Sequence, residues 1–427
     1  MEVLLLVLLA VFVVLGVPIG YVLLAASVAV IALGTETPLV VVPLRLFNGS
    51  DSFPMVAVPL FILSGALMNH AGISRRLVDF AASLVGFIRG GLAMTTTLSS
   101  MFFSEISGSA VADAAALGTI LIPAMKERGY PPRFAAAVLS SSATIAIVIP
   151  PSIPMILFGA ITGASIGKLF LAGFVPGVIS GLAIMLTSHF LAKRGGFADS
   201  QPFEWGRVSM SVRKALLALT LPLVILGGIF AGAFTATEAA AVAVFLALFL
   251  GLAVYGELRV REIYPILVDS ARQTGVVMIL VAASAVLGWY LANQQVPERI
   301  TSFVLSRVEG RAASLLLIDA VLLVAGMFLH STAAIVLLVP ILMPLATSIG
   351  LDPVHFGIIV TVSLAIGQQT PPVASVLMTA CSLAGESMWA VTRVNVWFIA
   401  ALTAVLLLVT FFPGLSLVLP NLLSPGP

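Results

Sequence analysis

The chain has 427 residues, of which 60% are hydrophobic and only 9% are charged, and its net charge is +2. So few charges could not cover the surface of a water-soluble protein of this length, and the small net charge offers no basic surface for nucleic acid. The single cysteine, Cys381, excludes a disulfide framework and a thiolate metal cluster. Long apolar runs, in place of short alternating strands, predict an all-α polytopic membrane protein.

The N-terminal apolar run from Val3 to Leu33 is the first predicted membrane element. No Lys or Arg precedes it, and it lacks a short apolar core that ends at a small-residue cleavage site, so we interpret it as a retained helix and not as a signal peptide. The sequence from Gly16 to Gly20, which contains Pro18, predicts a break within it.

A re-entrant hairpin is predicted over about residues 93–125, because the polar triplet Ser107-Gly108-Ser109 interrupts an apolar stretch. Glycine allows a tight turn there, and the two hydroxyls could bind an ion or a carboxylate. Glu105 and Asp113 flank the triplet and are candidates for orienting the hydroxyls or coupling an ion. The alternative is ordinary packing of small residues between membrane helices.

A broken helix is predicted over about residues 134–162, because three prolines, Pro150, Pro151 and Pro154, stand within five positions. Proline removes a backbone donor and forces the preceding residue out of helical geometry. In lipid the freed carbonyls need another partner, and unwound carbonyls that face a cavity are oxygen ligands suited to Na⁺. The exposed helix N-termini on the far side of the break favour an anion. The alternative is a structural kink.

The largest polar interruption, residues 193–214, contains five Lys or Arg and predicts a cytoplasmic linker. It divides the chain into a first half, residues 1–192, and a second half, residues 215–427. A shift of 221 residues aligns 120–151 with 341–372 without a gap and superimposes the two Pro-Pro pairs. The basic loop 126–133 then falls on the uncharged loop 347–354. The halves are therefore predicted to be inverted repeats, the arrangement typical of secondary transporters.

The second half is predicted to contain the same two features, a hairpin over about 312–346 and a broken helix over about 355–384. We expect the two tips and the two breaks to meet around one cavity near the middle of the membrane. The sequence from Thr235 to Glu238 is a helix-capping pattern, which favours a structural role for Glu238 over a role in transport.

Taken together, the motifs resemble the large permease (M) subunit of tripartite ATP-independent periplasmic (TRAP) transporters. The resemblance covers essentially the whole chain. The stretches that carry it are residues 51–54, 59–65, 106–113, 149–154, 170–173, 237–243, 352–357 and 367–373. Many relatives carry an acidic residue at the position of His330.

The resemblance implies a Na⁺-driven, elevator-type importer in the bacterial inner membrane, surrounded by lipid. It implies an organic acid anion as substrate. It also implies two protein partners, a periplasmic substrate-binding protein and a small four-helix membrane subunit. Na⁺ would be the coupling ion, and no organic cofactor is expected.

We predict one Na⁺ site in each half, because hydroxyls and carbonyls suit a monovalent hard cation. The first site would comprise Ser107, Gly108, Ser109, Ser142, Ile149 and Pro150. The second would comprise Gly326, Met327, Thr332, Gln369 and Thr370. The substrate anion would lie against Ser107, Ser109, Ser152, Ser331, Thr332 and Gln368. Coupling or orienting roles are open for Glu105, Asp113 and His330.

Other functions remain as alternatives to this interpretation. One is an H⁺-coupled or exchange transporter that works without a binding protein, in which Glu105, Asp113 and His330 would titrate. A channel fits less well, since paired discontinuous helices are typical of alternating access. An enzyme would need a nucleophile and base or a metal cluster, and the sequence offers neither. No ATP-binding loop motif is present.

Overall fold

The structure is a computed structural model that describes residues 2–34, 37–197 and 202–423. Within those ranges all regular secondary structure is helical, and eight helices are long and apolar enough to cross a membrane. The helices of the first half are α1 (Glu2–Val14), α2 (Ile19–Gly34), α3 (Val41–Ser50), η1 (Phe53–Val56), α4 (Ala57–His70), α5 (Ile73–Val85), α6 (Gly91–Ser107), α7 (Ala110–Glu127), α8 (Pro132–Ala143), η2 (Thr144–Ile147), α9 (Ile153–Thr162) and α10 (Ile166–Gly195).

The remaining helices follow the central connection. They are α11 (Trp205–Phe230), α12 (Ala236–Phe249), η3 (Leu250–Val254), α13 (Val260–Asn293), α14 (Val296–Arg307), α15 (Arg311–Phe328), α16 (Ser331–Ser348), α17 (Pro353–Gly367), α18 (Ser375–Ala384), α19 (Met388–Phe411) and α20 (Gly414–Leu423). The all-helical fold predicted from composition is therefore confirmed. The N-terminal run is broken as predicted, since α1 ends at Val14 and α2 begins at Ile19.

The helix boundaries of the two halves repeat at a fixed interval. Helix α7 spans Ala110–Glu127 and α16 spans Ser331–Ser348, so both bounds differ by 221 residues. The same interval separates the starts of α8 and α17, at Pro132 and Pro353. It is the interval at which the two sequence segments align, because proline and glycine end helices at matching places.

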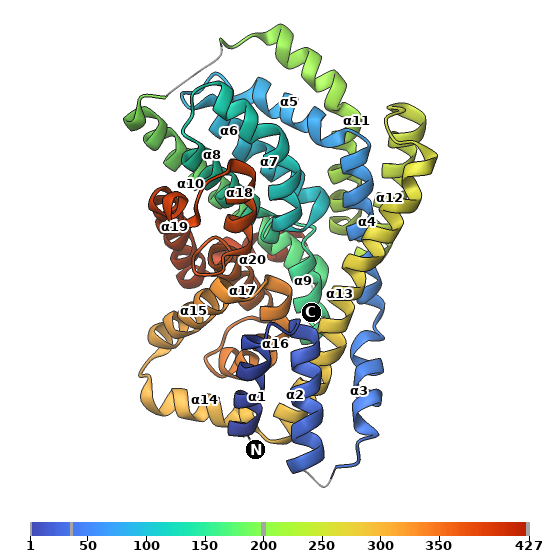
Figure 1. Cartoon of the computed structure of the whole chain (residues 1–427), viewed down its shortest axis with the longest axis vertical. Coiled ribbons are helices and arrows are strands. Elements are labelled where there is room, and N and C mark those ends of the chain that lie inside the picture. Colours follow the sequence, from blue (N-terminus) through green and yellow to red (C-terminus); the bar gives the residue numbers. More distant parts are fainter. Residues whose placement is uncertain (1, 35–36, 198–201, 424–427) are drawn as a thin grey trace.

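The halves are interlocked and do not lie side by side as separate bodies (Figure 1). Helix α7 of the first half packs against α18 of the second, and α16 packs against α9. In the same crossed manner α12 packs against α4, and α2 packs against α13. Each half therefore supplies the neighbours that bury the short helices of the other.

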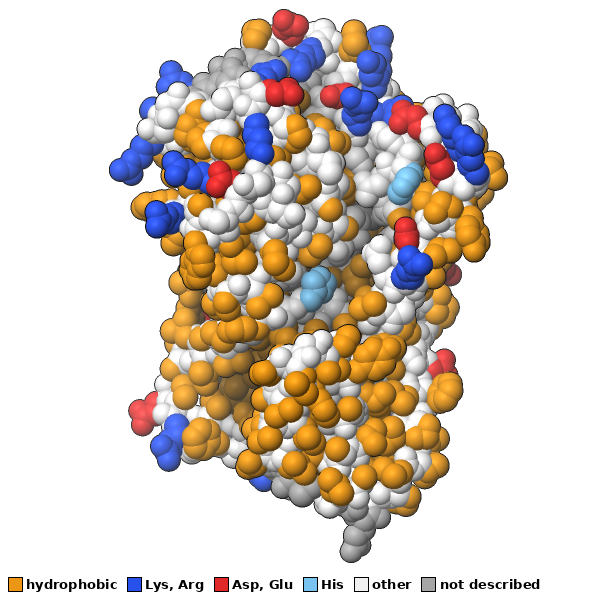
Figure 2. Space-filling view, in the orientation of Figure 1, with side chains coloured by type: hydrophobic (Ala, Val, Ile, Leu, Met, Phe, Trp, Pro, Cys, Tyr) orange, Lys and Arg blue, Asp and Glu red, His pale blue; other side chains and the backbone are white. Residues whose placement is uncertain are grey.

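The charged side chains gather at one end of the molecule, the end at which α5 and the start of α11 lie (Figures 1 and 2). The middle of the visible face is mostly hydrophobic, as expected for a surface in lipid. The central connection belongs to the charged end. Helix α10 continues into it as far as Gly195, and α11 begins at Trp205.

Candidate functional site

The first hairpin tip turns at Gly108, between α6 and α7, with a φ of +61°. The carbonyl oxygen of Gly108 accepts a hydrogen bond from the backbone N–H of Ile153 at 3.4 Å. A Cβ at residue 108 would lie 2.8 Å from the carbonyl oxygen of Pro151. Only glycine fits this turn without strain, because the backbone of the tip lies directly against the backbone of the first break.

A buried carboxylate stands behind this tip. Asp113 is completely buried, and its Oδ1 accepts a hydrogen bond from the hydroxyl of Ser107. The second oxygen, Oδ2, has no hydrogen-bond partner among the described residues. A buried carboxyl group is charged only where a cation or further donors compensate it, so this side chain, bonded to Ser107 of the tip, is the strongest candidate for a cation ligand.

The first break follows α8 and continues through the short helix η2 to Ser152. The Pro150–Pro151 peptide bond is cis. The hydroxyl of Ser152 donates to the carbonyl oxygen of Ile147 at 2.7 Å, so it does not cap the following helix α9. Ser142 lies 3.0 Å from the hydroxyl of Thr97, which ties α8 to the first arm of the hairpin.

The second tip likewise lies against the second break, through backbone hydrogen bonds. The carbonyl oxygen of Met327 accepts hydrogen bonds from the backbone N–H groups of Val373 and Ala374, both at 3.2 Å. Ser331 and Thr332, at the start of α16, are buried, whereas His330 is exposed. The His330 side chain is therefore open to its surroundings.

Glycines allow α15 and α17 to touch beside the second break. A Cβ at Gly367 would lie 2.5 Å from Cα of Gly326, and the Pro371–Pro372 peptide bond is cis, as in the first break. Gln368 and Gln369 are both completely buried, and the Nε2 atom of each has no hydrogen-bond partner among the described residues. Each of these amides therefore has donor capacity that a water molecule or a ligand can satisfy.

A polar network joins the two breaks across the halves. The hydroxyl of Ser141 donates to Oε1 of Gln369 at 2.6 Å and lies 2.9 Å from Oδ1 of Asn395. The Nδ2 of Asn395 donates to the carbonyl oxygen of Gln369 at 2.9 Å. All three side chains are completely buried. The second break is therefore held in place by a side chain of α8 and another of α19.

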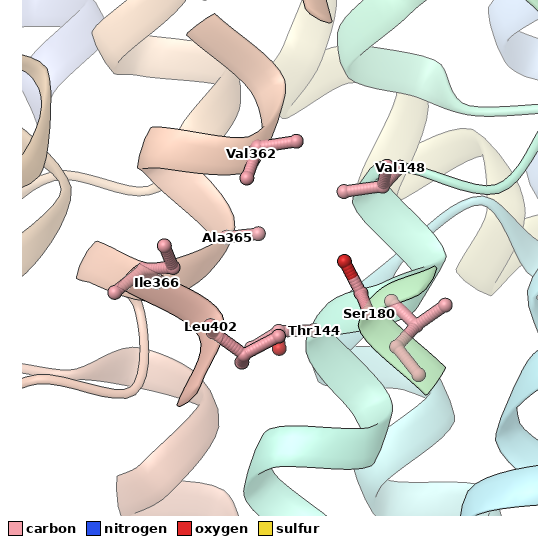
Figure 3. A pocket seen from close by; sticks show the side chains of 8 residues that line it. Thr144, Val148, Ser180, Val362, Ala365, Ile366 and Leu402 are labelled. Carbon is pink, nitrogen blue, oxygen red and sulfur yellow. The ribbon is translucent and has the colours of Figure 1, made fainter. Parts of the chain in front are cut away.

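A small cavity lies between the breaks (Figure 3). Val362, Ala365 and Ile366 of α17 lie across it from Thr144 and Val148. The remaining lining residues are Ile145, Ser180 and Leu402. Its wall is mainly apolar, with hydroxyls from Thr144 and Ser180.

The predicted site residues lie in two groups, one on each break. The Ser107–Ser109 tip lies on the first break, the 326–332 tip lies on the second, and Ser141 and Gln369 join the two. The cavity between the breaks is lined by residues that the sequence prediction did not include. Ser141 and Asn395 were also missed. An amide inside the largely apolar helix α19 was the signal that could have found Asn395.

Four helix N-termini in this region have no side-chain cap. They follow Ser109, Ser152, His330 and Ala374, the N-cap residues of α7, α9, α16 and α18. Elsewhere some helices are capped by side chains, as α10 is by Ser165, and others are not, as α11 and α15. Uncapped N-termini carry partial positive charge, which attracts anions.

Two acidic residues outside the tips have structural partners. Glu238 completes a capping box with Thr235 at the start of α12, which confirms the capping role predicted from the sequence. Asp319 is buried and accepts hydrogen bonds from the hydroxyl of Thr410 at 3.0 and 3.3 Å. Glu105, beside the first tip, is half-buried.

Two solved structures share the fold of this chain. The chain resembles the YdaH transporter of Alcanivorax borkumensis with a TM-score of 0.65 and 15% identity, covering 92% of this chain and 96% of that one. It resembles MtrF of Neisseria gonorrhoeae with a TM-score of 0.59 and 13% identity, covering 95% of each chain.

Sequence comparison defines the family. The family described as "Tripartite ATP-independent periplasmic transporter, DctM component" matches residues 6–415. The chain is 38% identical to the sialic acid TRAP transporter large permease SiaM of Vibrio cholerae, over 95% of each chain. It is 39% identical to the C4-dicarboxylate large permease DctM of Pseudomonas aeruginosa, over 89% of each chain.

The chain therefore belongs to the DctM family and is a large permease subunit of a TRAP transporter. Relatives of this kind are permeases and not enzymes. With its candidate membrane spans, the chain is an inner-membrane protein.

Proposed function

We propose that this permease couples the uptake of an organic acid anion to the entry of Na⁺. The observation that carries the proposal is the buried Asp113 carboxylate at the first tip, which has one hydroxyl partner and one oxygen without a partner. A monovalent cation bound beside Ser107 and Asp113 would neutralise that charge and hold the tip on the first break. The Na⁺ gradient would supply the driving force.

The second Na⁺ site that we propose differs in its ligands. Around Gln369 and Thr370 the available groups are carbonyls, amides and hydroxyls, and the described residues place no carboxylate in the tip itself. The carbonyl of Gln369 already accepts one hydrogen bond from Asn395 and retains a second lone pair. A neutral oxygen site of this kind would bind Na⁺ more weakly than the first.

The anion is proposed to bind where donors lie without acceptors. The amides of Gln368 and Gln369 and the uncapped N-terminus of α16 at Ser331 offer such donors. Relatives of this chain are named for sialic acid, isethionate and C4-dicarboxylate transport. These substrates share an anionic group, so the proposed substrate class is an organic anion.

We further propose that residues 1–192 and 215–427 are inverted repeats that work by an elevator movement. The hairpins and broken helices, α6–α10 and α15–α19, would move against a fixed part that contains α2, α4, α12 and α13. The crossed packing and the matching helix boundaries support this division.

Two partners complete the proposed transporter, a periplasmic substrate-binding protein and a small membrane subunit. One relative, DctMQ of Oleidesulfovibrio alaskensis, is named as an isethionate permease, and this chain is 40% identical to it and spans 64% of its length. The extra length leaves room for a fused second component. The small subunit would pack on the exposed apolar faces of α1, α11 and α12.

The test is uptake by proteoliposomes that contain this chain and both partners. We expect uptake with an inward Na⁺ gradient and little uptake when choline replaces Na⁺. Uptake that ignores Na⁺ but follows a proton gradient would overturn Na⁺ coupling and favour the H⁺-coupled alternative. Full uptake by the permease without either partner would contradict the tripartite assembly.

A further inference from the structure

The link between α4 and the first hairpin is the short helix α5, whose start is a sharp turn. Gly72 has a φ of +68°, and α5 follows at once from Ile73. The preceding Ala71 is completely buried, next to Gly251 of η3 and the adjoining Leu258. The turn is therefore packed against the connection between α12 and α13, although the two lie far apart in sequence.

Three side chains hold this turn. The guanidinium of Arg76 donates to Oε1 of Glu257 at 2.6 Å and lies 3.8 Å from the centre of the Tyr255 ring. The same guanidinium donates to the carbonyl oxygen of Gly72 at 2.9 Å. Arginine suits this position because its planar fork can stack on a ring and bond two acceptors at once.

Gly72 also lies close to the Glu257 side chain. A Cβ at residue 72 would lie 1.7 Å from Oε2 of Glu257, so a side chain there would displace the carboxylate. Gly256 has a φ of +65°, and the N–H of Leu258 donates to the carbonyl oxygen of Gly251 at 3.2 Å. These contacts hold the loop that presents Tyr255 and Glu257 to Arg76.

Helix α5 is also attached further along its length. The hydroxyl of Ser83 lies 2.7 Å from that of Ser211 on α11. Beyond it, Gly90 has a φ of +81°, and a Cβ at Gly91 would lie 2.3 Å from the carbonyl oxygen of Gly86. Residues 86–91 connect α5 to the hairpin, and α5 also packs directly on α6, with the Phe80 ring stacked on that of Phe102 at a centroid distance of 5.5 Å.

We propose that Arg76, Tyr255 and Glu257 form a latch that fixes the start of α5 to the α12–α13 connection. Movement of the hairpin would then leave the turn at Gly72 in place. The latch residues are positioning residues, since they lie away from both tips. This inference rests on the elevator movement proposed above, because a latch of this kind matters only if α6 moves relative to α12.

The test compares Arg76→Ala with Arg75→Ala, a matched control on the neighbouring exposed residue of the same helix. In the complete transporter we expect Arg76→Ala to lower the maximal uptake rate about five-fold, with the KM for substrate unchanged, because an ion pair and a ring contact are lost. Arg75→Ala should keep the wild-type rate. The double variant Arg76→Glu with Glu257→Arg, which exchanges the two charges, should restore much of the maximal uptake rate.

Equal rates for Arg76→Ala and Arg75→Ala would overturn the latch. So would a loss in Arg76→Ala that is matched by loss of Na⁺-dependent thermal stabilisation of the purified protein, since the site itself would then be damaged. The Na⁺ dependence of the wild-type protein, measured in the same vesicles, tests the proposed function separately. Its absence would contradict Na⁺ coupling, whereas the ratio between the variants would still decide the latch.

Discussion

The two tips of the molecule have matching flanking helices and differ in charge. Both follow a first helical arm, both lie on a Pro–Pro break, and their flanking helices α7 and α16 have matching bounds. The first tip has a buried carboxylate, Asp113, bonded to Ser107. The second places an exposed histidine, His330, at its turn and two buried amides on the neighbouring break.

This comparison shows which features are the same in the two halves and which differ. Prolines and glycines determine where helices end, and the interval of 221 residues is preserved in those positions. The side chains at the two tips have diverged. If both tips bind the coupling ion as proposed, the charged first tip should dominate the coupling.

The largest expected effect on uptake comes from replacing Asp113. Asp113→Asn keeps the shape and the hydrogen bond from Ser107 but removes the charge. A cation that loses its only carboxylate ligand loses about 3 kcal/mol or more, so we expect Na⁺-driven uptake to fall about 100-fold. Thr119→Val, on the exposed side of the same helix, should leave uptake near the wild-type value.

The measurement is the initial uptake rate against Na⁺ concentration in vesicles that hold the complete transporter. Asp113→Asn with a normal Na⁺ dependence would mean that the first tip does not bind the coupling ion. The difference between the two tips would then have no consequence for coupling.

The next effect tests the close packing of the second half. Gly367→Ala places a methyl group 2.5 Å from Cα of Gly326 and 2.6 Å from its carbonyl carbon. Both of these Gly326 atoms belong to the backbone. Overpacking of this kind costs roughly 1–3 kcal/mol, because neither helix can move aside freely. Gly326→Ala meets its nearest atom at 3.0 Å and should cost less.

Gly288→Ala serves as the control, since a Cβ there meets nothing within 4 Å. Thermal unfolding of the purified protein in detergent should give the lowest melting temperature for Gly367→Ala and an unchanged or higher one for Gly288→Ala. A melting temperature for Gly367→Ala equal to that of Gly288→Ala would show that the second break tolerates movement of α15.

Much of the fold could be predicted from the sequence because it depends on local signals. Pro18 and the glycines beside it indicated the break between α1 and α2, and the paired prolines at 150–151 and 371–372 indicated the two interrupted helices. Each such residue acts on the backbone of its own segment, so no knowledge of tertiary contacts was needed.

The site was less predictable because its contacts cross the halves. Ser141 bonds Gln369, 228 positions away, and Asn395 completes the network from a third helix. The repeat cannot indicate this network, since Val362 stands at the position that corresponds to Ser141. The lining of the cavity has the same origin, with Thr144 and Ile366 brought together only by the crossed packing.

A smaller effect on stability should come from the network of Ser141, Gln369 and Asn395. Asn395→Ala removes the donor to the carbonyl of Gln369 and should cost about 1–2 kcal/mol of stability. Ser141→Ala should cost less, and the double variant should cost less than the sum, because the residues share partners. Thr392→Ala, on the same helix, is the control. Additive costs would show that the network does not act as a unit.

The smallest effect concerns helix starts, where the halves also differ. Helix α12, which packs on α4, begins with the capping box of Thr235 and Glu238, whereas α2, which packs on α13, begins directly after Pro18. Thr235→Ala removes one cap and should cost about 1 kcal/mol of stability, seen as a slightly lower melting temperature. Uptake should be unchanged, because the cap lies away from both tips. Thr235→Ser, which retains the hydroxyl, should melt as the wild type does. A large loss of uptake in Thr235→Ala at unchanged stability would instead place Glu238 in the transport mechanism.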